Sequence, residues 1–594
     1  MSRAVVPRRA PGPPPYLVAV AVTGLLVLTA CARIPTSGPV KAGGDPRQQR
    51  IANGVSFIGQ PPAPGAAPVD VVLGFLQSSA DFVNDHDVAR QYLAPAARQS
   101  WRPQTGTLVY DRVASALAIE AGSDNGVSVT GSQTGAIDAD GRFRRMPAGS
   151  TVSLKFGLTR VAGEWRISRL DDGLVLSAVD VQETYRKLSL YFLAPSGSTL
   201  VPDEVLVPDL PGLRTKLVTR LLRGPTDDLR DAVGTAFPEG TVLDVGSVPV
   251  SRDGVATVRL DAAALKADDH ARQRMSAQLV WTLRQLPEVR KVHITAGGQG
   301  LIVAGSSGDQ ERNAWASFDP DALPSTPSVY VVDNGRVGRY IAGGFQPVLG
   351  QAGSGTLAVR SPAVSLDGSR IAAVSTDGRA VYVGPLSRDA PLTARIQGKD
   401  LSRPSWDRGN NLWAVDRAPG VIWYLADGSN SPREVVVPKP GPEGRPTAIA
   451  VSRDGARAAL VIGNKRGGVL RTAAVLRTEA SDSAVAGGAD LSLTSFAETR
   501  PGLRAVRDVA WADASTLVVV GSLDKGPVSP LLLDVDGYSE RDLDPLTDVV
   551  SIAAAPPLQG NPIVAATVDG KLFQITQGGG WQPVGDGKDP AYPG

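Results

Sequence analysis

Side chains that could act as metal ligands or nucleophiles are few and far apart in this sequence. The 594 residues include three histidines, His86, His270 and His293, and a single cysteine. Each histidine falls in a different predicted element, with no second histidine or cysteine at the spacing of a metal site. We expect polar, solvated helix starts around His86 and His270 and a half-buried strand around His293. The sequence therefore predicts no bound metal.

Catalytic sequence motifs are also lacking. The sequence has no G-x-S-x-G elbow, no P-loop and no H-E-x-x-H motif. Gly298-Gln299-Gly300 begins like a dinucleotide-binding loop but has Val303 where the third glycine belongs, so hairpin glycines are the better interpretation. Asp534-Val535-Asp536-Gly537 begins like a calcium loop but lacks the third aspartate and the glutamate at position 12, which favours a β-turn. We expect no catalytic residue, no cofactor and no enzyme activity.

Four tryptophans leave two interpretations open. Aromatic side chains on an exposed face can stack against sugars or anchor a partner protein. They can equally pack between repeated structural units, and two of the four occupy equivalent positions of a repeat described below. The residues are Trp406, Trp413, Trp423 and Trp511.

The one cysteine, Cys31, follows an export signal. Arg3, Arg8 and Arg9 form a positive amino-terminal region, and an apolar run covers Leu17 to Leu28. This run is shorter than the roughly 20 residues that a helix needs to cross a membrane, so it predicts a signal peptide. With one cysteine, internal disulfide bonds are impossible.

Residues Leu28-Thr29-Ala30-Cys31 resemble the lipobox of bacterial lipoproteins, which reads aliphatic, small, small, cysteine. The resemblance implies cleavage between Ala30 and Cys31, a diacylglyceryl thioether on Cys31 and acylation of its new amino group. One acyl chain binds a membrane only marginally, whereas two or more give stable anchoring. The predicted location is the outer face of the cytoplasmic membrane.

The rest of the chain divides into a tether and three domains. A net charge of +2 gives no electrostatic case for nucleic-acid binding. Residues 31–68 are rich in Pro, Gly and Ala and predict a semi-extended tether after the signal peptide of residues 1–30. Residues 69–176 show helical periodicity first, with a second helix expected over Asp87 to Ser100, and strand-like runs afterwards, which favours an α+β domain.

This first domain resembles the nuclear-transport-factor-2-like (NTF2-like) accessory domains. The resemblance rests on FLQSSADFVNDHDVARQYLAPAARQSW for the opening helices and on Gly163 to Ile167 for the final strand.

Residues 184–305 predict a second α+β domain, with a hairpin around Asp253-Gly254 and a long helix over Arg272 to Gln285. Leu190-Tyr191-Phe192, Leu221 to Thr226, Phe237 to Thr241, the DGVATV segment and Gln278 to Leu283 resemble, in order, the GerMN domain of spore germination proteins. These residues stop helices, make turns and fill a core, and none forms a catalytic arrangement.

Residues 318–590 contain an internal repeat that predicts a β-propeller of five or six blades. Each unit reads strand, aspartate-rich turn, strand, then one or two further strands, at 40 to 58 residue spacing. The longest interval contains Thr478 to Asp490, interpreted as a loop. Strands at 328–332 and 337–341 are expected to close the ring with strands around Leu572–Ile575 and Trp581–Val584, which removes exposed sheet edges. The repeats align on Ser365, Ser405, Ser452, Ala510 and Ser551.

Taken together, the lipobox, the IPTSGPV segment after it, the GerMN pattern and the terminal propeller resemble the actinobacterial LpqB lipoprotein family. That resemblance implies a membrane-anchored protein that modulates an envelope sensor histidine kinase of the MtrA–MtrB type, and so cell-wall growth and division, by contact with its extracellular domain. One alternative is a protein that binds envelope glycans or metabolites, and another is a propeller hydrolase.

Overall fold

The computed structural model describes residues 59–594 except 112–116, 123–124, 307, 324–327, 342–343, 389–390, 439–443, 465–466, 479–489, 495, 525 and 557–561. The signal peptide, Cys31 and most of the predicted tether lie outside the described residues. Residues 59–67 are described and contact the first domain: the Tyr92 hydroxyl donates to the Gln60 carbonyl at 2.8 Å, and Gly65 N donates to Glu164 Oε2 at 2.9 Å. The first domain therefore begins before residue 69.

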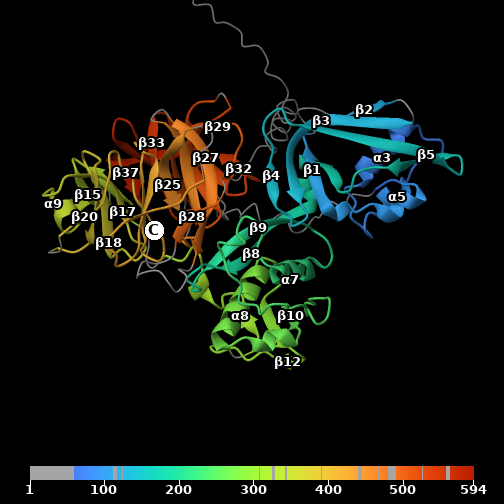
Figure 1. Ribbon diagram of the computed structural model, residues 1–594, viewed down its shortest axis with the longest axis horizontal. Coiled ribbons are helices and arrows are strands. Elements are labelled where there is room, and N and C mark those ends of the chain that lie inside the picture. Colours follow the sequence, from blue (N-terminus) through green and yellow to red (C-terminus); the bar gives the residue numbers. More distant parts are fainter. Residues whose placement is uncertain are drawn as a thin grey trace, which may run out of the picture. The chain divides into compact units, whose positions relative to one another are not determined.

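The first domain is an α+β fold in which short helices pack on a seven-stranded sheet (Figure 1). The strand order is β6-β5-β3-β1-β7, with β2 and β4 also paired to β3. Its core joins Phe75, Trp101 and Phe156 from the helical and sheet sides. The elements are α3 (Pro68–Ser78), α4 (Asp87–Gln91), α5 (Pro95–Ser100), η1 (Pro103–Thr105), β1 (Gly106–Tyr110), β2 (Ala118–Ala121), β3 (Gly126–Asp138), β4 (Phe143–Arg145), β5 (Thr151–Val161), β6 (Glu164–Arg169), β7 (Leu174–Ser177) and α6 (Ala178–Thr184).

The single helix expected over Asp87 to Ser100 is wrong. Two short helices, α4 and α5, replace it, and the chain between them is extended at Ala94, with a ψ of 155°. Pro95 causes the break, because proline disfavours the helical conformation in the residue before it and has no N–H to donate.

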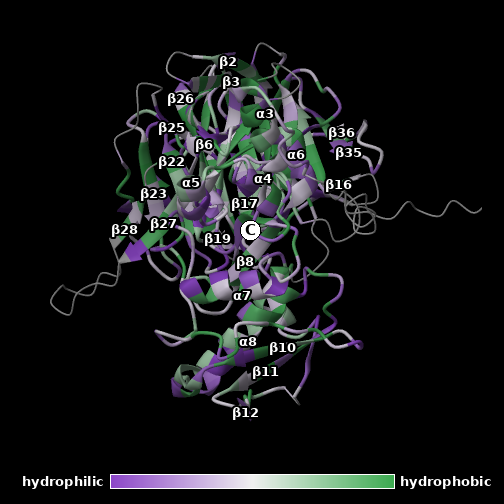
Figure 2. Cartoon of the chain, turned by 90° about the vertical axis from the view of Figure 1, so that its right-hand side faces the viewer, coloured by the Kyte–Doolittle hydropathy of each residue, from purple (hydrophilic) through white to green (hydrophobic). Residues whose placement is uncertain are grey.

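The second domain packs two helices against a hairpin and a small sheet. Amphipathic α7 buries Leu217, Val218 and Leu221, and Figure 2 shows its alternating polar and apolar stripes. The turn at Asp253-Gly254 is present. The strand after it, β10, forms its main ladder in parallel with β11, and not with the segment that precedes the turn. The elements are β8 (Tyr185–Leu193), β9 (Leu200–Pro208), α7 (Leu213–Arg223), β10 (Val255–Leu260), η2 (Ala262–Lys266), α8 (Asp269–Leu283), β11 (Lys291–Ala296), β12 (Gln299–Gly300), β13 (Gln310–Glu311) and η3 (Ala316–Phe318).

The described residues of the C-terminal half form a propeller of six four-stranded blades, which agrees with the predicted fold class. Blade one contains β16 (Gly344–Pro347), β15 (Arg336–Ile341), β14 (Tyr330–Asp333) and β37 (Lys588–Ala591), and α9 (Gln351–Ser354) follows it. Blades two and three are β17 (Val359–Val364), β18 (Arg370–Ser375), β19 (Ala380–Pro385), β20 (Thr393–Gln397), and β21 (Ser405–Trp406), β22 (Leu412–Asp416), β23 (Val421–Leu425), β24 (Arg433–Glu434). Blades four to six are β25 (Arg445–Val451), β26 (Arg457–Asn464), β27 (Gly467–Thr478), β28 (Asp490–Leu493); β29 (Leu503–Trp511), β30 (Thr516–Leu523), β31 (Ser529–Asp534), β32 (Glu540–Asp542); and β33 (Val549–Ala554), β34 (Ile563–Thr567), β35 (Lys571–Ile575), β36 (Trp581–Asp586).

The aligned repeat positions lie in, or directly after, the first strands of blades two to six, which confirms the repeat. Ring closure is also confirmed, but through a different strand from those expected. Strand β37, the last of the chain, pairs with β14, whereas the segments around Leu572–Ile575 and Trp581–Val584 are the outer strands β35 and β36 of blade six. The short run of residues after β36 gave too little periodicity to be recognised as a further strand.

Candidate functional site at the junction of the three domains

The site is built around Lys187, which β8 directs toward a turn of the propeller. Its Nζ lies 2.8 Å from Asp534 Oδ2, 3.3 Å from Asp536 Oδ2 and 3.3 Å from Glu204 Oε2. All four side chains are at most one-fifth exposed. Burial by itself would lower the pKa of Lys187, but the three carboxylates outweigh it and raise that pKa well above its ordinary value. The ammonium group is therefore charged, and it joins the second domain to the propeller.

The propeller side of this contact is residues 534–538, here called the docking turn, which connect β31 to β32. Gly537 has a φ of +71°, and a Cβ there would lie 2.1 Å from the Thr499 carbonyl oxygen, so the turn requires glycine. Asp536 Oδ1 accepts a hydrogen bond from Tyr538 N at 2.9 Å. The motif that begins like a calcium loop is thus a β-turn whose carboxylates bind a lysine.

The first domain contacts the same docking turn through β4. Arg145 Nε donates to the Gly537 carbonyl at 2.9 Å, and its Nη2 donates to the Tyr538 carbonyl at 3.2 Å. The Phe143 and Tyr538 rings meet edge to face with centroids 5.2 Å apart. One turn of the propeller therefore binds both preceding domains.

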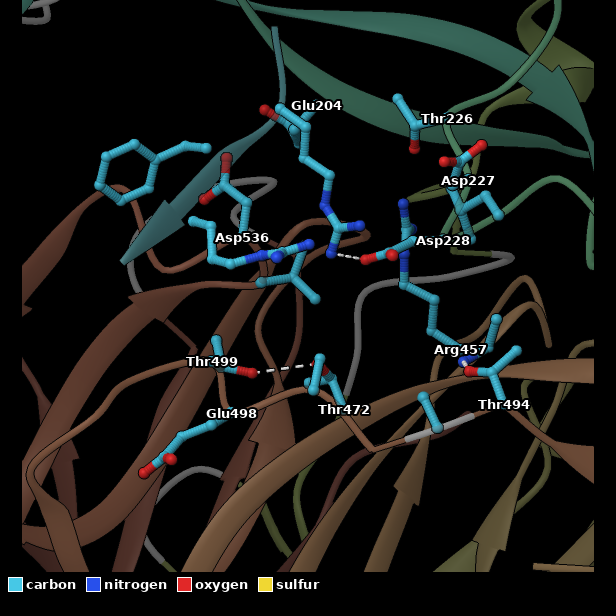
Figure 3. Close-up of a pocket in the computed structure, with 18 of the residues that line it drawn as sticks. Glu204, Thr226, Asp227, Asp228, Arg457, Thr472, Thr494, Glu498, Thr499 and Asp536 are labelled. Atoms are coloured by element: carbon cyan, nitrogen blue, oxygen red, sulfur yellow. Dashed lines mark hydrogen bonds and ion pairs between the residues drawn. The ribbon is translucent and has the colours of Figure 1, made fainter. Parts of the chain in front are cut away.

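A cavity of about 560 Å³, lined by charged and apolar residues of all three domains, lies beside the docking turn (Figure 3). An ion pair between Arg142 and Asp228 crosses it, and Thr472 and Thr499 share a hydroxyl hydrogen bond of 3.0 Å in its wall. Arg457, 7 % exposed, donates to the Pro202 carbonyl of the second domain. The cavity walls thus carry charges of both signs, and they include the Thr226 hydroxyl, which donates to Asp203 Oδ1 at 2.9 Å.

The axis of the propeller is filled by arginines of its own blades. Arg403 Nη2 lies 3.0 Å from Asp508 Oδ1, and its Nη1 donates to the carbonyls of Ile552 and Pro590 at 3.1 Å each. Arg453 donates to the carbonyls of Trp511 and Ala554, and burial lowers the pKa of Arg453 to about 10.

The linker between the second domain and the propeller covers the end of this axis where the inner strands finish. Arg408 Nη2 donates to the carbonyls of Asp319, Pro320 and Ala322 at 3.3, 2.9 and 3.2 Å. Asp321 Oδ1 accepts from Ala514 N at 2.8 Å, and burial, with the nearby Asp513 charge, raises the pKa of Asp321 to about 7.

The structure places the histidines in three separate environments. His86 is buried, 5 % exposed, against the Phe82 and Trp101 rings, so its expected solvated position is wrong. Three successive residues with positive φ, 84–86, turn the chain and direct the ring inward, and burial lowers the pKa of His86. His270 is exposed, and His293, in β11, is partly exposed with Nδ1 2.7 Å from Asp309 Oδ1. Within the described part of the chain, no group of three or more His, Cys, Asp or Glu side chains is arranged to hold a metal ion.

The four tryptophans pack within and between blades, which favours the structural interpretation. Trp406, Trp413 and Trp511 are at most 4 % exposed, and Trp423 is partly buried. Trp413 belongs to the core between blades three and four, and Trp511 Nε1 donates to the Ala450 carbonyl of the neighbouring blade at 2.9 Å. Gly298 lies in the turn between β11 and β12, and Gly300 lies in β12, where it pairs antiparallel with Thr295, as expected for hairpin glycines.

Sequence reasoning did not identify Lys187, Arg145 or Glu204 as interacting residues. Each lies beside another charged residue in a strand, and nothing in the local pattern indicates that Lys187 and Arg145 have partners in the propeller, hundreds of positions away. The pair of aspartates at 534 and 536 was the only sequence feature that could have indicated this contact.

Comparison with known proteins accounts for all three domains. Family models described as "Lipoprotein LpqB, N-terminal domain", "Sporulation and spore germination" and "Lipoprotein LpqB beta-propeller domain" match residues 61–182, 189–301 and 335–593. Lipoprotein LpqB of Thermobifida fusca is 31% identical over 627 residues, which cover 96% of this chain and 97% of that protein. The chain belongs to the LpqB lipoprotein family.

Other LpqB relatives match over similar lengths. Lipoprotein LpqB of Streptomyces coelicolor is 32% identical and covers 98% of each chain, and that of Mycobacterium tuberculosis is 30% identical over 89% of this chain and 90% of its own. The match to the LpqB family thus includes the tether region and all three domains. No helix among the described residues is long and apolar enough to cross a membrane.

Proposed function

We propose that the protein is anchored to the outer face of the cytoplasmic membrane by lipid on Cys31 and modulates an envelope sensor histidine kinase, of the MtrB kind, by contacting its extracellular domain. The observation that carries the proposal is that relatives named LpqB lipoproteins match nearly the whole chain. The kinase partner is the role that this family resemblance implies.

The junction supports an interaction protein. Buried contacts around Lys187, and those of Arg145 and Phe143 with the docking turn, join three domains into one unit. A partner would then meet surfaces of more than one domain in a fixed arrangement, which lowers the entropic cost of binding.

The propeller axis favours an interaction protein over a propeller hydrolase. Arg403 and Arg453 fill the axis and are hydrogen-bonded to backbone carbonyls of other blades. Both therefore have a structural role at the place where a propeller enzyme would hold its substrate.

The test is co-reconstitution of the lipidated protein and a full-length MtrB-type kinase in lipid vesicles, with kinase autophosphorylation as the measurement. We expect the rate to change with the surface density of the lipoprotein. The Cys31→Ser variant should need a far higher bulk concentration for the same effect, because anchoring raises the effective concentration. An autophosphorylation rate that is unchanged at every density would contradict the proposal.

A further inference from the structure

The open end of the propeller axis has a wide recess lined by cations. It lies where the inner strands begin, opposite the end that the 319–322 linker covers. Its volume is about 1150 Å³, and it is lined by two loops, at 399–400 and 417–418, and by strand residues of blades four to six. Four of its lining residues are cationic and are here called the cationic rim: Lys399, Arg417, Arg445 and Arg507.

The three arginines of the rim are held in place by backbone carbonyls. Arg417 Nε donates to the Thr447 carbonyl at 2.8 Å, and Arg507 Nη1 donates to the Val549 carbonyl at 2.9 Å. Arg445 in turn donates to the Ala418 carbonyl. A guanidinium has five N–H donors, so each of these contacts leaves donors on a group whose position is already fixed. Arg445 and Arg507 are exposed to solvent.

The charge of the recess is not balanced by its own residues. Asp400 is the one carboxylate among the described lining residues, and it lies 3.4 Å from both Arg417 and Arg360. The chain as a whole is nearly neutral, with 61 basic and 59 acidic residues. Like charges gathered around one concave surface repel each other and concentrate a positive potential, which an anion relieves.

Hydrogen bonding between neighbouring blades explains only part of this arrangement of cations. A hydrogen bond to a carbonyl accounts for one or two donors of each arginine, but it gives no role to Lys399, which is exposed on the same rim. The backbone of Lys399, not its ammonium, makes the local contact, with N donating to Asp416 Oδ2 at 2.8 Å.

The walls indicate what kind of anion fits. The described lining residues combine Thr447, Gly463 and Gly467 with the small apolar side chains of Ala418, Val506 and Val550, and none of them is an aromatic residue of the type that anchors protein partners. A concave recess also cannot receive the flat surface of a bilayer. A small hydrophilic ligand with several anionic groups can enter this recess and matches its charge.

We propose that the cationic rim binds a small hydrophilic polyanion carrying phosphate or carboxylate groups, the anions that guanidinium forks recognise in bidentate fashion. This site is independent of the docking turn and of the kinase contact, so a failure of polyanion binding would leave the proposed function unaffected, and the reverse also holds.

The test is titration of the full mature protein, at low salt, with inorganic tripolyphosphate and with a galacturonate oligomer, and with a neutral galactose oligomer as the uncharged comparison. We expect one site for at least one of the two polyanions and none for the neutral oligomer. Preference between the two distinguishes phosphate from carboxylate. The dissociation constant should rise steeply with salt, because exposed charges are screened.

Three variants locate the site. Arg507→Gln should weaken binding about tenfold, as expected for a lost charge-assisted hydrogen bond, and Lys399→Gln should weaken it several-fold without removing any interblade contact. The matched control is Arg541→Gln, which removes an exposed cation from β32 of blade five, away from the recess. Binding of neither polyanion, or equal weakening by Arg541→Gln and Lys399→Gln, would overturn the proposal.

Discussion

Lys187 Nζ and Asp534 Oδ2 lie 2.8 Å apart although 347 positions separate them in the sequence. The lysine belongs to the first strand of the second domain and the aspartate to the docking turn of the propeller. Removing the cation would take away the positive charge that three mostly buried carboxylates share, which is far more costly than losing a surface pair.

We therefore predict that Lys187→Met lowers the unfolding free energy by about 3–5 kcal/mol. The matched control is Lys291→Met, because Lys291 forms an ion pair with Glu311 in which both side chains are over 40 % exposed. The control should leave stability nearly unchanged. Urea unfolding followed by tryptophan fluorescence measures both. Equal shifts for the two variants would show that the Lys187 cluster does not join the domains.

The linker carboxylate predicts a specific pH dependence. Burial and the neighbouring anions Asp513 and Asp319 raise the pKa of Asp321 to about 7, although the nearby cations Arg453 and Arg408 oppose this shift. The folded state then holds this proton more tightly than the unfolded chain, whose carboxyl titrates near 3.9. Stability from this group is complete at low pH and is lost as the pH rises toward 7.

Asp321→Asn keeps an oxygen that can accept from Ala514 N and removes the charge. We predict that the variant gains about 2–3 kcal/mol over the wild type between pH 5 and pH 8. Thermal unfolding of both proteins at the two pH values provides the measurement. A stability difference that is the same at pH 5 and pH 8 would refute the raised pKa.

Ring closure by β37 makes the last residues of the chain essential to the propeller. Truncation after Asp586 removes β37 and exposes the edge of β14, and exposed edges promote aggregation. We predict a large fall in the melting temperature and the appearance of oligomers in size-exclusion chromatography. Ser361→Ala, which removes only the 2.7 Å hydrogen bond from Ser361 Oγ to Asp589 Oδ2, should cost about 1 kcal/mol and leave the protein monomeric. A truncated chain that stays monomeric and cooperative would rule out closure by this strand.

The fold was largely predictable because its signals are local. Alternating strands and Asp-Gly turns recur along the propeller, so Ser365 and Ser452 could be aligned without any knowledge of distant contacts. Pro95 could have indicated the break between α4 and α5, but the apolar spacing of Tyr92, Leu93 and Ala96 favoured one helix.

The junction was not predictable for the opposite reason. Lys187 and Arg145 acquire their partners only when the domains come together, and Asp534 and Asp536 look locally like any other turn. His86 shows the same limit, since its burial follows from a backbone reversal over residues 84–86 and not from its polar neighbours.

Anchoring is expected to depend on one atom, the Cys31 sulfur. We predict that Cys31→Ser moves the protein from the detergent phase to the aqueous phase in phase partitioning and leaves its melting temperature unchanged, since Cys31 precedes the described domains. Retention in the detergent phase with incorporation of labelled fatty acid would place the anchor elsewhere.

Photo-crosslinking in living cells tests the central claim, contact with a sensor kinase, most directly. A photoreactive residue can replace Val83, Ile302 or Val568, which are 58 %, 79 % and 66 % exposed and lie in the first domain, the second domain and the propeller. The lipidated protein is crosslinked in place, and captured membrane proteins are identified by mass spectrometry. We predict that a sensor histidine kinase is captured from at least one position, and that the capture is lost when Cys31 is replaced by serine. No histidine kinase captured from any position above the level of the Cys31→Ser variant would contradict the account.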